Sequence, residues 1–74
     1  MSRATFLVQT KDARTPAARF TATDHVDLGE QIAVYLTRHR QLAPNVAFHA
    51  HIGSERGAIQ QAGRVVTFAI TQES

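Results

Sequence analysis

One stretch of helical periodicity, set between short alternating segments, constrains the fold of this chain more than any other feature. From Asp24 to Leu42, residues able to face a core recur at helical spacing and form a single stripe. The members of this stripe are Leu28, Ile32, Tyr35, Leu36 and His39, with Leu42 at its end. A helix with one such face must bury it against another layer, which the rest of the chain has to supply.

The ends of the predicted helix are marked by residues that favour helix termini. Asp24 is a good N-cap, and Asp27 with Glu30 three residues later is an alternative capping pair. At the other end, Pro44 prevents the helix from continuing, because proline lacks the backbone N–H and clashes with the preceding turn. The sequence therefore predicts one amphipathic helix over about residues 24–42.

Four other segments show the two-residue alternation of half-buried β-strands. They are Ala4–Thr10, Ala17–Thr23, Val46–Ile52 and Arg64–Thr71. The polar segment Lys11–Pro16 is typical of a loop, so the first two strands are expected to form a β-hairpin. Residues 53–63 could form a short helix or a long hairpin loop, and a loop with one helical turn is the favoured prediction.

These elements predict an α+β domain, a four-stranded antiparallel sheet with one amphipathic helix on one face. The chain order is ββαββ, or βαββ if the second strand is a loop. The residues expected to face the core are Phe6, Val8, Phe20, Leu28, Ile32, Tyr35, Leu36, Val46, Phe48, Ile52, Val66, Phe68 and Ile70. With 74 residues, the whole chain 1–74 is expected to be one domain.

Composition excludes several kinds of site and indicates the cell compartment. The chain has no cysteine, which excludes disulfides, thiolate metal sites and a cysteine nucleophile. Its first residues, Met1–Phe6, lack the apolar region of a secretion signal, and no apolar run is long enough to span a bilayer. We therefore expect a soluble, cytoplasmic protein that makes no membrane contact.

One face of the predicted sheet is left without a covering layer. Its expected residues are Thr5, Leu7, Gln9, Arg19, Thr21, Thr23, Ala47, His49, His51, Val65, Thr67, Ala69 and Thr71. An antiparallel sheet tolerates water on one face, and this composition of threonine, small residues and histidine suits that state. The same face could equally dock a partner or a second copy of the chain.

The pair His49 and His51 is the most suggestive local pattern. Two histidines two residues apart on a strand point to the same face and can share a metal ion. A zinc site needs at least a third protein ligand, and the sequence fixes none, although His25 and Asp24 are candidates if the helix begins near this strand. We therefore predict no metal and no cofactor.

The basic residues are the second set of candidates. Net charge is only +2, but seven of the eight basic residues are arginine, which suits bidentate contact with carboxylate or phosphate. Arg38, His39 and Arg40 complement the helix dipole and need no further role. They could also contact phosphate, helped by Lys11, Arg3, Arg14 and Arg19 if the first hairpin lies nearby. The predicted partner-binding residues are Arg14, Arg19, Arg38, Arg40, His49, His51, Arg56 and Arg64.

The sequence carries no recognisable catalytic pattern. Ser2, Ser54 and Ser74 stand near a terminus or in a loop, none in a nucleophile elbow, and there is no glycine-rich phosphate loop. The one enzymatic arrangement worth weighing is a nuclease-like cluster of His49, His51 and Arg19. We expect a protein that is not an enzyme.

The order strand, helix, strand, strand over this length resembles two known groups. It is similar to dodecins, which store flavin by stacking it on tryptophan, but the chain has no tryptophan and that function is not implied. It also resembles anti-CRISPR proteins, small inhibitors from phages and mobile elements that pair a bent antiparallel sheet with one helix. That resemblance covers the outline of Ala4–Thr10, Asp24–Leu42, Val46–Ile52 and Arg64–Thr71, and implies no site residues.

The leading hypothesis is a small inhibitor or modulator that occupies the surface of a host protein or nucleoprotein complex. The first alternative is a nucleic-acid-binding regulator that acts through a basic rim, as a homodimer. The inward register of all four phenylalanines argues against base stacking on the open face in that case. The second alternative is a histidine-dependent nuclease or metal-binding protein.

Overall fold

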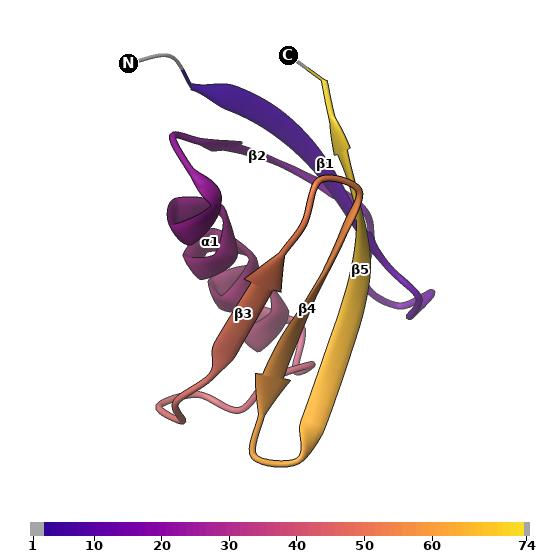
Figure 1. Cartoon of the computed structure of the whole chain (residues 1–74). Coiled ribbons are helices and arrows are strands. Elements are labelled where there is room, and N and C mark those ends of the chain that lie inside the picture. Colours follow the sequence, from indigo (N-terminus) through magenta and orange to yellow (C-terminus); the bar gives the residue numbers. More distant parts are fainter. Residues whose placement is uncertain (1–2, 74) are drawn as a thin grey trace.

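The computed structural model describes residues 3–73, so Ser2 and Ser74 lie outside the described residues. It contains one helix and five strands (Figure 1). In chain order the elements are β1 (Ala4–Thr10), β2 (Ala18–Ala22), α1 (His25–Arg38), β3 (His49–Ile52), β4 (Arg56–Gln61) and β5 (Arg64–Gln72). The α+β class, the single helix and the first hairpin agree with the sequence-based prediction.

The five strands form one antiparallel sheet in the order β2-β1-β5-β4-β3. The sheet curls, and α1 lies in its concave side, where it contacts both edge strands, β2 and β3 (Figure 1). The two strands furthest apart in sequence, β1 and β5, are neighbours in the sheet, with Val8 opposite Ile70. The other face of the sheet is not covered by any described element and is called the open face below.

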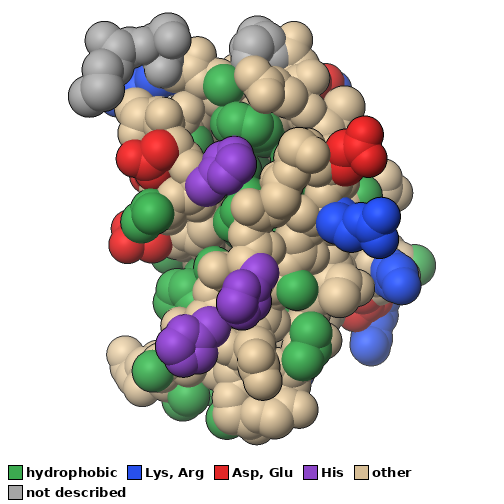
Figure 2. Space-filling view, in the orientation of Figure 1, with side chains coloured by type: hydrophobic (Ala, Val, Ile, Leu, Met, Phe, Trp, Pro, Cys, Tyr) green, Lys and Arg blue, Asp and Glu red, His purple; other side chains and the backbone are tan. Residues whose placement is uncertain are grey.

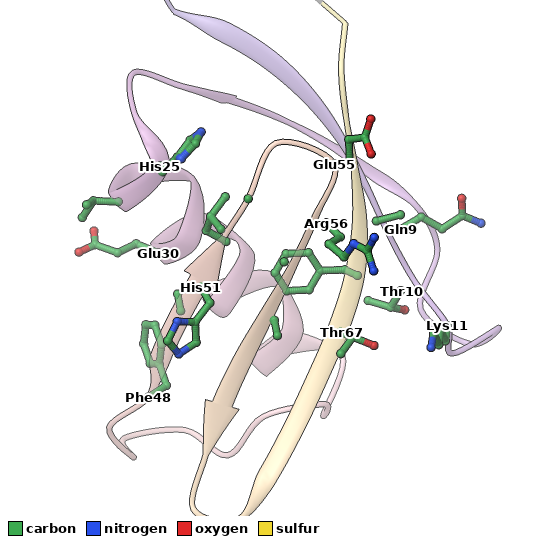
Figure 3. A pocket seen from close by; sticks show the side chains of 18 residues that line it. Gln9, Thr10, Lys11, His25, Glu30, Phe48, His51, Glu55, Arg56 and Thr67 are labelled. Carbon is green, nitrogen blue, oxygen red and sulfur yellow. The ribbon is translucent and has the colours of Figure 1, made fainter.

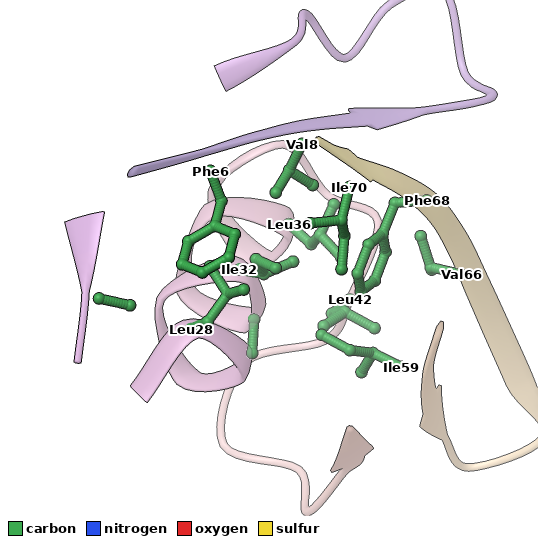
Figure 4. Packing of buried hydrophobic residues seen from close by; sticks show 12 residues of the cluster. Phe6, Val8, Leu28, Ile32, Leu36, Leu42, Ile59, Val66, Phe68 and Ile70 are labelled. Carbon is green, nitrogen blue, oxygen red and sulfur yellow. The ribbon is translucent and has the colours of Figure 1, made fainter. Parts of the chain in front are cut away.

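The core lies between α1 and the concave face of the sheet (Figure 4). Its residues are Phe6, Val8, Ala22, Leu28, Ile32, Ala33, Leu36, Leu42, Ile59, Val66, Phe68 and Ile70. The helix approaches β3 closely at Gly29, where an added Cβ would stand 3.1 Å from the Cβ of Ala50. Ala50 and Ile52 therefore face α1, and His49 and His51 face the opposite way, onto the open face.

Both ends of α1 are capped. The Asp24 carboxylate accepts a hydrogen bond from the backbone N–H of Asp27 at 2.8 Å, so Asp24 is the N-cap. At the other end, Arg40 has a φ of 61° and donates its N–H to the Thr37 carbonyl, while Gln41 donates to Leu36. This is a Schellman ending, which stops the helix at Arg38 rather than at the expected Leu42.

The prediction of a loop over residues 53–63 is wrong, because β4 occupies most of this segment and raises the strand count from four to five. The inward positions of β4 are Gly57, Ile59 and Gln61, so only one of them is a large apolar residue. Phe68 fills the space beside Gly57: a Cβ added there would stand 2.6 Å from the phenylalanine ring. The neighbouring strand thus supplies the apolar bulk that β4 lacks.

The start of the third predicted strand is also wrong. Val46 and Phe48 are 42% and 37% exposed rather than buried, and β3 begins only at His49. Asn45 has a φ of 62°, which interrupts the extended backbone. The Val46 carbonyl accepts a hydrogen bond from the Gln61 side-chain amide at 3.1 Å. The segment before β3 is therefore an irregular connection that runs outside the core.

Within residues 3–73, the single helix is too short and too polar to cross a lipid bilayer.

Candidate functional site: a basic hollow beside an exposed histidine edge

The open face is larger than the sequence indicates, because β4 contributes to it. Its rows follow the pairing of the strands: His51 lies beside Ala58 and Thr67, and Arg56 lies beside Ala69. Ala69 in turn pairs with Gln9 of β1. Small residues thus occupy the middle of the face, with polar and charged side chains on either side. Among the described strand residues of this face, none is Phe, Tyr or Trp, and the aromatic groups are the imidazoles of His49 and His51 on β3.

A hollow of about 400 Å³ lies beyond the end of β1, where the β1–β2 loop and the C-terminal end of α1 approach the first half of β5. Its residues are Thr10, Lys11, Asp12, Arg14, Arg40, Gln41, Arg64, Val65, Val66 and Thr67. Four basic side chains from three separate segments line it, against one carboxylate. We call this the basic hollow.

Asp12 and Gln41 organise the basic hollow. The Asp12 carboxylate accepts hydrogen bonds from the backbone N–H of Arg14 at 2.9 Å and from the Gln41 side-chain amide. These two bonds, in that order, hold the pKa of Asp12 below its usual value. Gln41 also donates to the Thr15 hydroxyl, and its carbonyl accepts from Arg64 at 2.8 Å. The loop, the end of the helix and β5 are thereby joined around the hollow.

Arg40 holds its place in the basic hollow at a conformational cost. Its φ of 61° lies in the left-handed region, where a side chain other than glycine costs about 1–2 kcal/mol. Glycine is the common residue at this position of a helix ending, yet here it carries a long cationic side chain. A strained residue kept at such a position is the kind of feature that accompanies a functional site.

The basic residues extend from the hollow onto the open face. A second, larger hollow, which we call the edge hollow, runs from β1 across β5 and β4 to β3 and the start of α1 (Figure 3). Lys11 lines both hollows, and Arg56 extends over β5 toward Gln9 in the same view. Figure 2 shows Lys and Arg side chains gathered on one side of this face and histidines on the other.

Most of these cations are free of protein carboxylates. In the described part of the chain, ion pairs join only Arg14 to Asp12, at 3.6 Å, and Arg19 to Glu73, at 2.8 Å. Lys11, Arg40 and Arg56 have no acidic partner within that range. Their charge is available to an external anion.

The six predicted arginines separate into three groups, and the predicted histidines His49 and His51 stand apart from them on β3. Arg14, Arg40 and Arg64 all line the basic hollow. Arg56 lines the edge hollow, which shares Lys11 with the basic hollow. Arg38 is exposed in the last turn of α1 but does not line either hollow. Arg19 lies on the opposite edge strand, β2, where its guanidinium is held by Glu73.

The nuclease-like cluster of His49, His51 and Arg19 is not formed. The histidines stand on β3 and the arginine on β2, with three strands between them. Nor do His25 and Asp24 complete a site with the two histidines: within residues 3–73, no group of three or more His, Asp or Glu side chains is placed to hold a metal ion.

No family model, curated protein or solved structure matches this chain.

Sequence reasoning missed the parts of the site that depend on the end of the helix. It weighed Lys11 as a helper of Arg40 but gave no role to Asp12 or Gln41, which hold the loop against the helix. A signal was present in two groups of positive charge, Lys11 and Arg14 in the β1–β2 loop and Arg38 and Arg40 at the end of α1. Only the closure of the sheet brings those loops together.

Proposed function

We propose that this protein is a non-enzymatic binding protein whose basic hollow holds the phosphate backbone of a nucleic acid, free or within a nucleoprotein complex. The observation that carries the proposal is the convergence of Lys11, Arg14, Arg40 and Arg64 on one hollow with a single carboxylate. Such a cluster attracts a polyanion, and each phosphate it engages releases bound counterions. The affinity is then dominated by salt-dependent electrostatics.

The distribution of charge supports a polyanion over a small acidic group. The acidic residues Asp24, Asp27 and Glu30 lie at the first turns of α1, at the opposite end of the helix from Arg38 and Arg40. A molecule with its charges separated in this way is oriented as it approaches a nucleic acid, basic end first. Because Arg56 continues the basic surface beyond the hollow, more than one phosphate can be engaged along it.

The composition of the open face indicates the mode of binding. No Phe, Tyr or Trp lies on its described strands, and Phe6 and Phe68 are buried in the core. The aromatic groups it offers a base are the imidazoles of His49 and His51, which stand on the edge strand β3, away from the basic hollow. Contacts to phosphate alone position a protein without reading bases. We therefore propose binding with little dependence on sequence.

The test is a titration of labelled duplex DNA, duplex RNA and single-stranded RNA by fluorescence anisotropy over a range of salt concentrations. Arg14→Gln and Arg40→Gln are each expected to weaken binding and to lower the slope of log K against log salt by about 0.9 on duplex DNA. Arg3→Gln is the matched control, since it removes the same charge at the other end of β1, roughly 20 Å away at 3.3 Å per residue.

The proposal is wrong if none of these nucleic acids binds, or if Arg3→Gln weakens binding as much as Arg40→Gln does. Circular dichroism of each variant establishes that the fold is retained. A charge effect that depends on position, and not only on net charge, is the result that supports the hollow as the site.

The inhibitor hypothesis drawn from the sequence remains a proposal compatible with this site. A small protein that occupies phosphates of a nucleoprotein machine blocks it by occupancy, without chemistry. Capture of partners from a lysate with and without nuclease treatment separates the cases. Retention of a discrete protein complex after nuclease treatment, unaffected by Arg40→Gln, would favour a protein surface as the partner and count against phosphate binding.

A further inference from the structure

The strand β3 is a free edge of the sheet. It pairs with β4 on one side, and no strand lies on its other side in the described part of the chain. The edge hollow borders this edge: it is lined by Phe48, Ala50 and Ile52 and by His25 and Val26 of α1, and Figure 3 labels Phe48 and His25 in it. This hollow is where a further strand would lie along β3.

The pairing with β4 determines which backbone groups of β3 are available. The N–H of Gly53 donates to the carbonyl of Arg56 at 2.9 Å, which makes these two residues a hydrogen-bonded pair. Bonded and non-bonded pairs alternate in an antiparallel ladder, so His51 and His49 direct their backbone groups toward β4. The N–H and C=O groups of Ala50 and Ile52 point outward, to the empty side.

An antiparallel partner identical to β3 can meet these outward groups in two registers, with the two-fold axis between the two His51 residues or between the two Ala50 residues. With the axis at His51, Ala50 pairs with Ile52 of the second copy and His49 lies opposite Gly53. With the axis at Ala50, Ala50 forms a hydrogen-bonded pair with its own copy and Ile52 pairs with residue 48. Only this second register places His51 opposite His49 of the second copy, twice, so a metal ion shared by the four histidines would select it.

We propose that two copies of this chain pair through β3 and that the four histidines brought together on the open face bind one Zn²⁺ ion. Non-bonded cross-strand pairs hold their side chains close, with Cβ atoms about 4.5–5.5 Å apart. The two cross-strand pairs lie two residues apart along the strands, roughly 7 Å at 3.3 Å per residue. Their four imidazoles reach toward the space between the pairs and can supply the tetrahedral nitrogen ligands that zinc accepts. One chain supplies only two of them, so the site is incomplete without the second copy.

A second copy suits this edge better than an unrelated strand does. Both histidines are exposed and lie on the same face, so a two-fold axis at Ala50 gathers four imidazoles on that face. On the other face of the same ladder, the register brings Ile52 and position 48 of the two copies together, where Phe48 is 37% exposed in the single chain. The dimer thus covers apolar surface while completing the metal site.

The experiment is analytical ultracentrifugation of the full chain with and without Zn²⁺, combined with calorimetric titration of Zn²⁺. The expected result is a monomer in chelator, a dimer with zinc, and a stoichiometry of one Zn²⁺ per two chains. Either His49→Ala or His51→Ala removes two of the four ligands and is expected to abolish zinc-dependent dimerisation. His39→Ala, which removes an exposed imidazole from the other end of α1, should leave it unchanged.

Three outcomes would overturn the proposal: no binding of Zn²⁺, binding of one Zn²⁺ per chain without dimerisation, or zinc-dependent dimerisation that survives loss of both histidines. Circular dichroism of the histidine variants checks that they fold, and NMR of the wild-type imidazoles reports directly whether His49 and His51 shift when zinc is added. The basic hollow takes no part in this site, so the result is independent of the proposed function.

Discussion

The side-chain amide of Gln61 forms two hydrogen bonds with the main chain of Ala43. Its Oε1 accepts from the Ala43 N–H at 2.8 Å, and its Nε2 donates to the Ala43 carbonyl at 3.0 Å and to the Val46 carbonyl at 3.1 Å. The amide thus takes the place of a backbone partner in a β-ladder. Gln61 is only 5% exposed, so β4 holds the connection between α1 and β3 through one buried polar side chain.

Replacing Gln61 should therefore unfold the protein more easily. Gln61→Ala is expected to lower the free energy of unfolding by about 1–3 kcal/mol, because it removes several hydrogen bonds and leaves backbone groups to find water. Urea denaturation followed by circular dichroism measures the change. Gln60→Ala, on the exposed side of the same strand, is the control and should change stability little; equal losses in the two variants would contradict this role.

Arg40 is expected to trade stability for binding. Arg40→Gly relieves the left-handed backbone at this position and should raise the free energy of unfolding by about 0.5–1 kcal/mol, after the greater freedom of glycine in the unfolded chain is counted. The same substitution removes a cation from the basic hollow and should weaken binding to nucleic acid. Thermal denaturation and anisotropy on one variant test both effects; a gain in both quantities would argue against a binding role for Arg40.

The turn between β4 and β5 offers a stabilising substitution at Ala62, a residue that lines neither hollow. Ala62 and Gly63 have φ values of 45° and 83°, the pattern of a type I′ hairpin turn. Asparagine tolerates the first of these positions better than alanine does. Ala62→Asn should raise the melting temperature, with a gain of about 0.5–1 kcal/mol, and should leave nucleic-acid binding unchanged.

Gly57 is required by the approach of Phe68. A Cβ at this position would stand 2.6 Å from the Phe68 ring and 2.9 Å from the His51 carbonyl, so Gly57→Ala should destabilise the fold by about 1–3 kcal/mol. Because the ring is the closest obstacle, the loss should be smaller when Phe68 is already leucine. A double-mutant cycle by urea denaturation measures this coupling. Strictly additive losses would mean that the backbone contact, and not the ring, is decisive.

Asp12 should make the stability of the fold depend on pH in the acidic range. Its pKa is lowered in the folded protein, first by the Arg14 backbone N–H and then by the Gln41 amide. A lowered pKa means that the stabilisation is present above the ordinary aspartate pKa of about 3.9 and is lost as the pH falls through the lower folded value. Melting temperatures measured from neutral pH downward should fall less steeply in Asp12→Asn than in the wild type. Parallel curves would show that other carboxylates account for the acid sensitivity.

The sequence predicted those elements whose pattern is carried by their own residues. The segment Ala4–Thr10 forms β1 with the expected bounds, and Asp24 caps the helix as expected. The strand β4 was missed because two of its three inward positions, Gly57 and Gln61, are not apolar. Each is compensated by a distant partner: Phe68 fills the space of one, and the main chain near Ala43 satisfies the other.

The candidate site was harder to predict than the fold because its residues come from three separate places: the β1–β2 loop, the end of α1 and the start of β5. Arg40 and Arg64 are both recognisable as exposed cations, but their meeting depends on the helix ending at Arg38 and on Arg64 reaching the carbonyl of Gln41. The sequence pattern extended the helix to Leu42, which would have placed Arg40 on a helical surface. The left-handed conformation of Arg40, which turns the chain toward β5, depends on tertiary contacts that the local sequence pattern does not contain.

From the pairing of β1 with β5 we expect a particular order of events as the chain folds. The hairpin of β1 with β2 and the run from β3 to β5 are joined by neighbouring segments and can close quickly, whereas Val8 meets Ile70 only after a long loop has closed. During synthesis, β1 is made long before its central partner. Until β5 leaves the ribosome, one edge of β1 and the apolar stripe of α1 are uncovered, and this interval is when the nascent chain is most exposed to aggregation and to chaperones.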